Sequence, residues 1–203
     1  INKEVVRREK NEEKIVKYLD MPIQHSNGEI LKRMHRPGNT EKLTALINHI
    51  REKMPDITLR TTLITGFPGE TEEQFNELAE FVNDIKFDHL GCFAYSQEEG
   101  TQAAEFDDQI DEDVRSHRSD IIMQQQTLVN AEKLEKMQDK TVEAVIEGFD
   151  KYAEVSFGRT KADAPDIDGK IFVMSEKPLR MGEYVNVHIT DSMDYDLIGE
   201  VAE

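Results

Sequence analysis

Hydrophobic and polar positions divide the chain into two regions with different periodicities. In the first, a short run rich in β-branched residues at 57–65 and a short apolar run at 89–95 alternate with segments whose apolar residues recur at helical spacing. After Lys140, short alternating runs follow one another, separated by Gly, Pro and Asp. Strands that alternate with helices are typical of a parallel sheet. Short strands that follow one another directly are typical of a small barrel. The pattern therefore predicts an α/β domain over 1–140 and an all-β domain over 141–203.

The first region reads as three strand–helix units. Thr71 and Gln74 have the spacing of a capping box at a helix start. Three units are too few to close a (β/α) barrel, so we expect this region to be the second half of something larger. In chain order we expect a helix over 2–17, a buried strand over 18–22, a short helix capped by Ser26 and Asn27, a helix from Thr40 to about Pro55, a strand over 57–65, a helix from Thr71, a strand over 89–95, an acidic loop over 97–113 and a long helix ending near Lys140.

The second region has the strand number and spacing of a small barrel of the size of an OB fold. Its five predicted strands are Val142–Ile146, Tyr152–Phe157, Ile171–Met174, Tyr184–Ile189 and Leu197–Val201.

The net negative charge of the chain indicates which macromolecules it can bind. The chain carries 25 Lys and Arg against 42 Asp and Glu, a formal charge of −17. Such a surface repels phosphate backbones and attracts basic proteins, which disfavours general nucleic-acid binding. Acidity for solubility alone is the alternative explanation.

Cysteine content limits the chemistry. Cys92 is the only cysteine, so this chain alone can form neither an intramolecular disulfide nor a cysteine-rich zinc or iron–sulfur site. Its position in a predicted interior strand favours a small core residue over a ligand. The sequence has no apolar run of the ~20 residues that a membrane span needs and no export signal, so we expect a reducing, cytoplasmic location and no membrane partner.

The segment 59–71 is the most informative for function. It is a strand that ends in the turn Gly66-Phe67-Pro68-Gly69 and leads into a helix. Such a turn exposes backbone groups at the carboxyl edge of a parallel sheet, where cofactors bind, and two glycines let a ligand approach the main chain. A tight strand-to-helix turn without a ligand is the alternative, and the lysine of a P-loop is absent.

This segment resembles the fifth-strand motif of the radical S-adenosylmethionine methylthiotransferases. Tyr18–His25 with the following Leu31–Met34 also resembles that family, and Phe93–Thr101 is similar to its sixth-strand motif. The region after 140 resembles the TRAM domain that ends these enzymes. The resemblance implies an α/β fold: the C-terminal half of a radical-SAM partial (β/α) barrel over 1–140, then a small all-β, OB-like TRAM barrel over 141–203.

Within this family the tail is similar to the RimO type, carried by 157–160, 162–169 and 189–200. That resemblance implies methylthiolation of the β-carbon of an aspartate in the twelfth small-subunit ribosomal protein. Residues 141–203 hold 6 Lys and Arg against 14 Asp and Glu, a charge of −8, which suits a basic ribosomal protein better than tRNA. A tRNA adenosine methylthiotransferase of the MiaB type and a non-enzymatic RNA- or protein-binding module remain alternatives.

The resemblance also implies cofactors and partners that this chain cannot supply alone. Family members bind S-adenosylmethionine and [4Fe–4S] clusters held by cysteines, and an electron donor drives formation of a 5′-deoxyadenosyl radical. None of those cysteines is in this chain. We therefore expect the missing N-terminal half of the same protein as a partner, and no activity from these 203 residues alone.

The same resemblance implies that the strand ends line the S-adenosylmethionine side of the cavity. Arg60 lies in one of these strands, but the face it takes depends on the register. We expect no catalytic residue in this chain. The residues expected close to the cofactor are Gln24, Thr62, Leu63, Gly66 and Glu70.

Two further features have two interpretations each. His25, at a predicted strand end, could face the cofactor or be a hydrogen-bonded structural residue. One basic cluster could contact a carboxylate or a sulfur-bearing anion, or be a solvated helix face; it consists of Lys32, Arg33, His35 and Arg36. The histidines show no paired metal-ligand spacing, and the carboxylates of Glu98 and Glu99 fit loop solvation better than acid–base chemistry.

Overall fold

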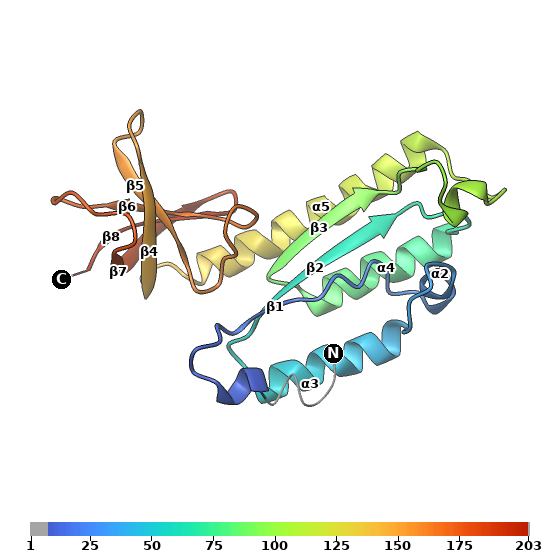
Figure 1. Cartoon of the computed structure of the whole chain (residues 1–203), viewed down its shortest axis with the longest axis horizontal. Coiled ribbons are helices and arrows are strands. Elements are labelled where there is room, and N and C mark those ends of the chain that lie inside the picture. Colours follow the sequence, from blue (N-terminus) through green and yellow to red (C-terminus); the bar gives the residue numbers. More distant parts are fainter. Residues whose placement is uncertain (1–7, 203) are drawn as a thin grey trace. The chain divides into compact units, whose positions relative to one another are not determined.

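The computed structural model describes residues 8–202 and contains two compact units (Figure 1). Of the described residues, 8–10 and 19–129 form the first unit, and 11–18 with 130–202 form the second. The chain therefore divides inside a helix, before the first barrel strand at Thr141. The units divide after Val129, whereas the sequence suggested a boundary at 140. Leu134 and Met137 belong to the second unit because both pack against the barrel core. Tyr18 belongs with the barrel unit for a similar reason, since its hydroxyl donates to Asp168 at 2.5 Å.

The first unit is built on a three-stranded sheet in the order β1-β2-β3, and β2 and β3 run parallel, as the alternating pattern predicted. In their register Thr62 lies opposite Gly91. The elements of this unit, some of which extend into the second, are β1 (Tyr18–Asp20), α2 (Gly28–Arg33), α3 (Thr40–Lys53), β2 (Thr58–Thr65), α4 (Glu72–Ile85), β3 (His89–Ala94), the 3-10 helix η1 (Gln102–Glu105) and α5 (Glu112–Glu135).

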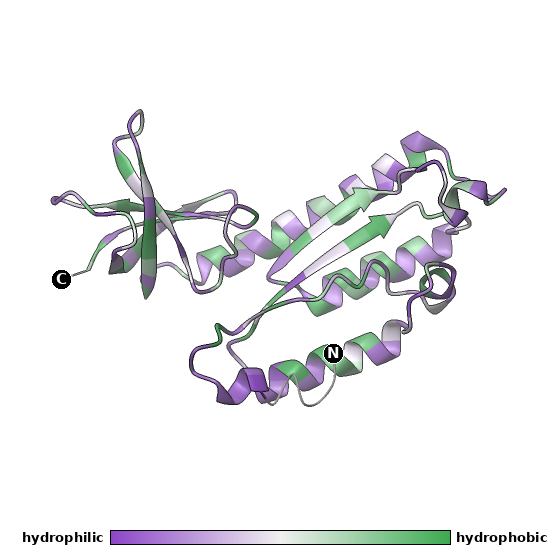
Figure 2. Ribbon diagram, viewed as in Figure 1, coloured by the Kyte–Doolittle hydropathy of each residue, from purple (hydrophilic) through white to green (hydrophobic). Residues whose placement is uncertain are grey.

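Alternation along β2 separates the two faces of the sheet. Leu59 and Leu63 are fully buried in a core with side chains of α3, α4 and α5. Arg60, Thr62 and Ile64 point to the other face and are only half-buried. Arg60 pairs there with Asp20 at 2.9 Å, which answers the question of register. The helices carry hydrophobic and hydrophilic bands, as covering one sheet face requires (Figure 2).

Local capping signals predicted two helix starts correctly. The side chain of Asn27 accepts hydrogen bonds from the backbone N–H groups of Glu29 and Ile30 at the start of α2. Thr71 and Gln74 form both halves of the predicted capping box at the start of α4. These bonds satisfy N–H groups that a helix leaves unpaired, so they are encoded by the nearest residues.

The beginning of the chain differs from the prediction. Residues 8–11 are helical, but 12–17 form turns and bends, so a helix over 12–17 was wrong. Residues 2–7 of that prediction lie outside the described part. Ile15 and Val16 are 40% and 52% exposed, so this stretch buries no apolar face to stabilise a helix. The following strand is also shorter than predicted, ending at Asp20, and only half-buried.

The second unit is a closed five-stranded barrel in the order β4-β5-β6-β8-β7, as the strand spacing predicted. Its pairs are antiparallel except for β6 with β8, which run parallel. The strands are β4 (Thr141–Asp150), β5 (Val155–Thr160), β6 (Ile171–Met174), β7 (Tyr184–Met193) and β8 (Asp196–Val201). Among the described residues, no helix is both long and apolar enough to cross a membrane.

Candidate functional site

The carboxyl edge of the β1-β2-β3 sheet gathers the segments that the sequence marked. The chain after β1 pairs with β2 once more at Gln24, which forms a parallel bridge with Leu63. The N–H of Gln24 donates to the carbonyl of Thr62 at 2.9 Å, and the N–H of Ile64 donates to the carbonyl of Gln24 at 2.8 Å. Gln24 takes a left-handed conformation, with φ 71°, so the chain turns away from the sheet directly after this bridge.

Both glycines of the turn after β2 are required by its shape. Gly66 and Gly69 have φ of 70° and 79°, which disfavours any side chain. A Cβ atom on Gly66 would lie 2.2 Å from Cγ of Arg115, and one on Gly69 would lie 2.3 Å from Nη1 of Arg33. The turn is therefore closely covered by side chains of α2 and α5.

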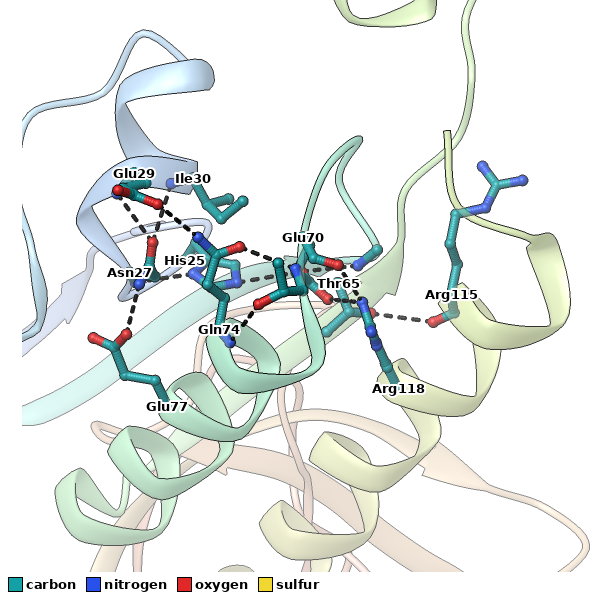
Figure 3. Close-up of polar contacts among 12 residues, drawn as sticks. His25, Asn27, Glu29, Ile30, Thr65, Glu70, Gln74, Glu77, Arg115 and Arg118 are labelled. Atoms are coloured by element: carbon teal, nitrogen blue, oxygen red, sulfur yellow. Dashed lines mark hydrogen bonds and ion pairs between the residues drawn. The ribbon is translucent and has the colours of Figure 1, made fainter. Parts of the chain in front are cut away.

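Glu70 ends this turn and is the centre of a buried polar cluster (Figure 3). One carboxylate oxygen accepts from the N–H of Gly66 at 3.0 Å and lies 3.2 Å from Nε2 of His25. The other accepts from Nη1 of Arg118 at 2.7 Å. The side chains of Glu70 and His25 are 0% exposed and that of Arg118 is 12% exposed. His25 is thus a buried, hydrogen-bonded residue, which confirms the structural interpretation.

Two mostly apolar cavities lie at this edge of the sheet and share Gln24, Ile64, Tyr95 and Ala103. The first, of about 450 Å³, is completed by Thr62, Phe93, Ala94, Ser96, Glu98 and Thr101. The second, of about 420 Å³, is completed by Arg33, Met34, His35, Arg36, Phe67, Gln102 and Phe106.

The residues expected near a cofactor fall into two groups. Gln24 and Thr62 line the larger cavity. Leu63 turns its side chain into the helix-covered core, so only its backbone lies at the edge. Gly66 and Glu70 lie in the turn and line neither cavity. Cofactor contact by each of the five stays a prediction.

The basic cluster is occupied by contacts within the protein. Arg33 forms a bidentate pair with Asp108 at 2.8 and 2.7 Å and lies 4.9 Å over the ring of Phe106. Hydrogen bonding to Asp108 raises the pKa of Arg33, and hydrogen bonding to Arg33 lowers the pKa of Asp108. Arg36 donates to the carbonyl of Pro22, and Nε2 of His35 lies 3.1 Å from Oε1 of Gln102. Lys32 is exposed.

Cys92 is a core residue, as its position predicted. Burial, partly offset by hydrogen bonding to Ser119, raises the pKa of the Cys92 thiol to about 11, so the thiol stays protonated at neutral pH. The described residues contain no group of three or more His, Cys, Asp or Glu side chains that could hold a metal ion. This part of the chain therefore does not fit an iron–sulfur cluster.

Two residues of the site were missed from the sequence. Arg118 is 48 positions from Glu70, on a helix rich in charges, and nothing local marks it. The available signal was indirect: a carboxylate buried at a strand end needs a cation. Tyr95 lines both cavities, and its buried hydroxyl has no hydrogen-bond partner among residues 8–202.

Comparison with known proteins identifies the families that the two parts of the chain match. Residues 1–82 match the radical SAM superfamily model and residues 140–202 match the TRAM domain model. The chain is 45% identical over 201 residues to the ribosomal protein uS12 methylthiotransferase RimO of Acetivibrio thermocellus, covering 99% of this chain. This chain belongs to the RimO-type radical SAM methylthiotransferase family.

Other RimO-type relatives give the same picture. The enzymes of Clostridium novyi and Geobacter sulfurreducens, both named as ribosomal protein uS12 methylthiotransferases, are each 46% identical, over 100% and 95% of this chain. The chain spans only 43–45% of the length of these three relatives.

A solved structure supports the fold. Coproporphyrinogen III oxidase (HemN) from Escherichia coli, described as a radical SAM enzyme, superposes with a TM-score of 0.50 and 24% identity. The match covers 66% of this chain and 30% of that one, and it bears on the fold alone.

Proposed function

We propose that this chain provides one wall of the S-adenosylmethionine chamber, and the TRAM barrel, of a methylthiotransferase that modifies the β-carbon of an aspartate in ribosomal protein uS12. The observation that carries the cofactor assignment is the cavity of about 450 Å³ at the carboxyl edge of the sheet. Ligands of α/β sheets bind at this edge. The names of the RimO-type relatives support the substrate.

The lining of that cavity suits S-adenosylmethionine, which has an aromatic base, hydroxyl groups and charged ends. Phe93 and Tyr95 offer aromatic surface, while Gln24, Thr62 and Glu98 offer polar groups. The hydroxyl of Tyr95, which has no hydrogen-bond partner in the described part of the chain, is a polar atom that a ligand could satisfy. Bound S-adenosylmethionine would supply the radical and the methyl group, and the residues of this chain would bind it, orient it and exclude water.

An assay on the intact 203-residue chain tests the cofactor assignment. We expect binding of labelled S-adenosylmethionine in equilibrium dialysis, weakened by Thr62→Trp, which would fill the cavity, and unaffected by Thr127→Trp at an exposed position of α5. Equal binding by both variants would contradict the assignment. Because this chain has no cysteine set for a cluster, we also propose that it does not cleave S-adenosylmethionine alone; cleavage by the isolated chain would refute that.

Charge supports a basic protein as the macromolecular substrate. The barrel region 141–203 has a formal charge of −8 over 63 positions, which opposes binding to the phosphates of tRNA. We expect the chain to bind uS12 with an affinity that falls as salt rises, and to bind tRNA more weakly. Tighter, salt-sensitive binding of tRNA would favour a tRNA methylthiotransferase, and binding of either without S-adenosylmethionine binding would favour a non-enzymatic module.

A further inference from the structure

We propose that Glu70, His25 and Arg118 are positioning residues that hold the two neighbouring main-chain segments of the wall shared by the cavities, and that Glu70 acts through this contact and not as a cofactor ligand. The inference rests on the proposed function for its catalytic consequence. Its structural basis is the buried cluster of Figure 3, in which one carboxylate meets donors from three separate chain segments.

The carboxylate of Glu70 is enclosed by protein groups and lines neither cavity. Oε2 accepts a hydrogen bond from the N–H of Gly66 and lies beside Nε2 of His25. Oε1 accepts from Nη1 of Arg118, which also donates to the backbone carbonyl of Glu70 at 3.0 Å. Glu70, His25 and Arg118 are absent from the linings of both cavities. A carboxylate so enclosed is available to its protein partners and not to a ligand.

The hydrogen bonds around His25 indicate which ring nitrogen donates to Glu70. The backbone N–H of Asn27 donates to Nδ1 of His25 at 3.0 Å, so Nδ1 is an acceptor and carries no proton. The ring proton is therefore on Nε2, which donates to Glu70. Among the described residues, Arg118 is the Lys or Arg side chain that forms an ion pair with Glu70.

These contacts reach the cavity walls through the backbone. His25 directly follows Gln24, which lines both cavities and whose backbone is hydrogen-bonded to Thr62 and Ile64. Gly66, whose N–H donates to Glu70, directly follows the strand β2 that carries Thr62 and Ile64. One carboxylate thus fixes both segments that form the shared wall, and a shift of either would displace ligand-facing atoms.

Amide hydrogen exchange on the intact chain measures this role directly, because the N–H of Gly66 is protected by Glu70 itself. We expect His25→Leu and Glu70→Gln to speed exchange at Gly66 roughly tenfold or more, because each disturbs the carboxylate. His25→Gln, which keeps a side-chain N–H donor, should restore much of the protection. The amide of Ile57 is the internal control, since it lies outside this turn, donates to the backbone carbonyl of Met54 and should not change.

The catalytic consequence is measured in a chimera that joins the preceding part of the Acetivibrio thermocellus relative to this chain. His25→Leu should raise the KM for S-adenosylmethionine by more than it lowers kcat, and His25→Gln should reverse the effect. Unchanged exchange at Gly66, or faster exchange with an unchanged KM, would overturn the inference. Failure of the unsubstituted chimera to modify uS12 would instead count against the proposed function, and the exchange result would still decide whether Glu70 holds the turn.

Discussion

Two ion pairs lie at the same edge of the sheet, and they differ chiefly in exposure. In the pair of Glu70 with Arg118 the side chains are 0% and 12% exposed, whereas those of Arg33 and Asp108 are 35% and 49% exposed. Water stabilises the charges of an exposed pair almost as well when they are apart as when they are paired, so the pair adds little to stability. A buried charge that loses its partner is not hydrated, so its loss costs much more free energy. We therefore expect the buried pair to contribute much more to stability than the exposed pair, although both are Arg–carboxylate pairs at the same edge of the sheet.

Arg118→Met should have the largest effect, because it leaves the carboxylate of Glu70 buried without a cation. We expect the free energy of unfolding in urea to fall by about 3–5 kcal/mol. Arg51→Met is a matched control: Arg51 also makes two hydrogen bonds, but to the backbone carbonyls of Ile85 and Lys86. Equal losses for the two variants would show that burial of Glu70 adds nothing.

Gly66→Ala should have the next largest effect and tests how tightly the buried side of the edge is packed. The left-handed backbone costs about 1–2 kcal/mol for a side chain. The overlap with Arg115 should add about 1–3 kcal/mol. Gly100→Ala isolates the first cost, because Gly100 has φ 81° but no atom within 4 Å of a new Cβ. Thermal or urea unfolding of both variants measures the difference, and similar losses would mean that Arg115 moves aside freely.

Asp108→Asn and Arg33→Met should have small effects on stability, since their pair is exposed. A double-mutant cycle should give a coupling energy of about 0–1 kcal/mol that declines with added salt. A coupling that matched the loss from Arg118→Met would erase the contrast between the two pairs.

The smallest expected effect is the pH dependence of the exposed pair. Its hydrogen bond with Arg33 lowers the pKa of Asp108 in the folded protein. The stabilisation is therefore present above the pKa of Asp108 in the unfolded chain and is lost as pH falls through the lower, folded value. The difference in unfolding free energy between wild type and Asp108→Asn should be constant near neutrality and shrink in acid. A difference that grew in acid would have the wrong sign for this pair.

Local signals predicted the elements of the fold, and long-range contacts decided the site. Asn27 and Thr71 marked helix starts because caps bond to the nearest N–H groups. The alternation along β2 predicted a half-buried strand, because alternate side chains of a strand point to opposite faces of the sheet. The helix predicted over 2–17 was wrong for residues 12–17, because the apolar side chains of Ile15 and Val16 stay largely exposed.

Partners of charged residues could not be predicted from the sequence. Glu70 finds Arg118 at a separation of 48 positions, and Arg33 finds Asp108 at 75. The motif identified Glu70 as part of the site without showing what its carboxylate contacts. Only the packing of α5 across the sheet edge answers that question.

The most direct measurement of the proposed function is the mass of uS12 from bacteria that lack their own uS12 methylthiotransferase and express the chimera of the Acetivibrio thermocellus relative with this chain. The unmodified relative in the same cells is the positive control. We predict that uS12 gains the mass of one methylthio group, placed on an aspartate by fragmentation of the peptide. Unmodified uS12, while the control is active, would contradict the account, most clearly if the methylthio group were found in tRNA instead.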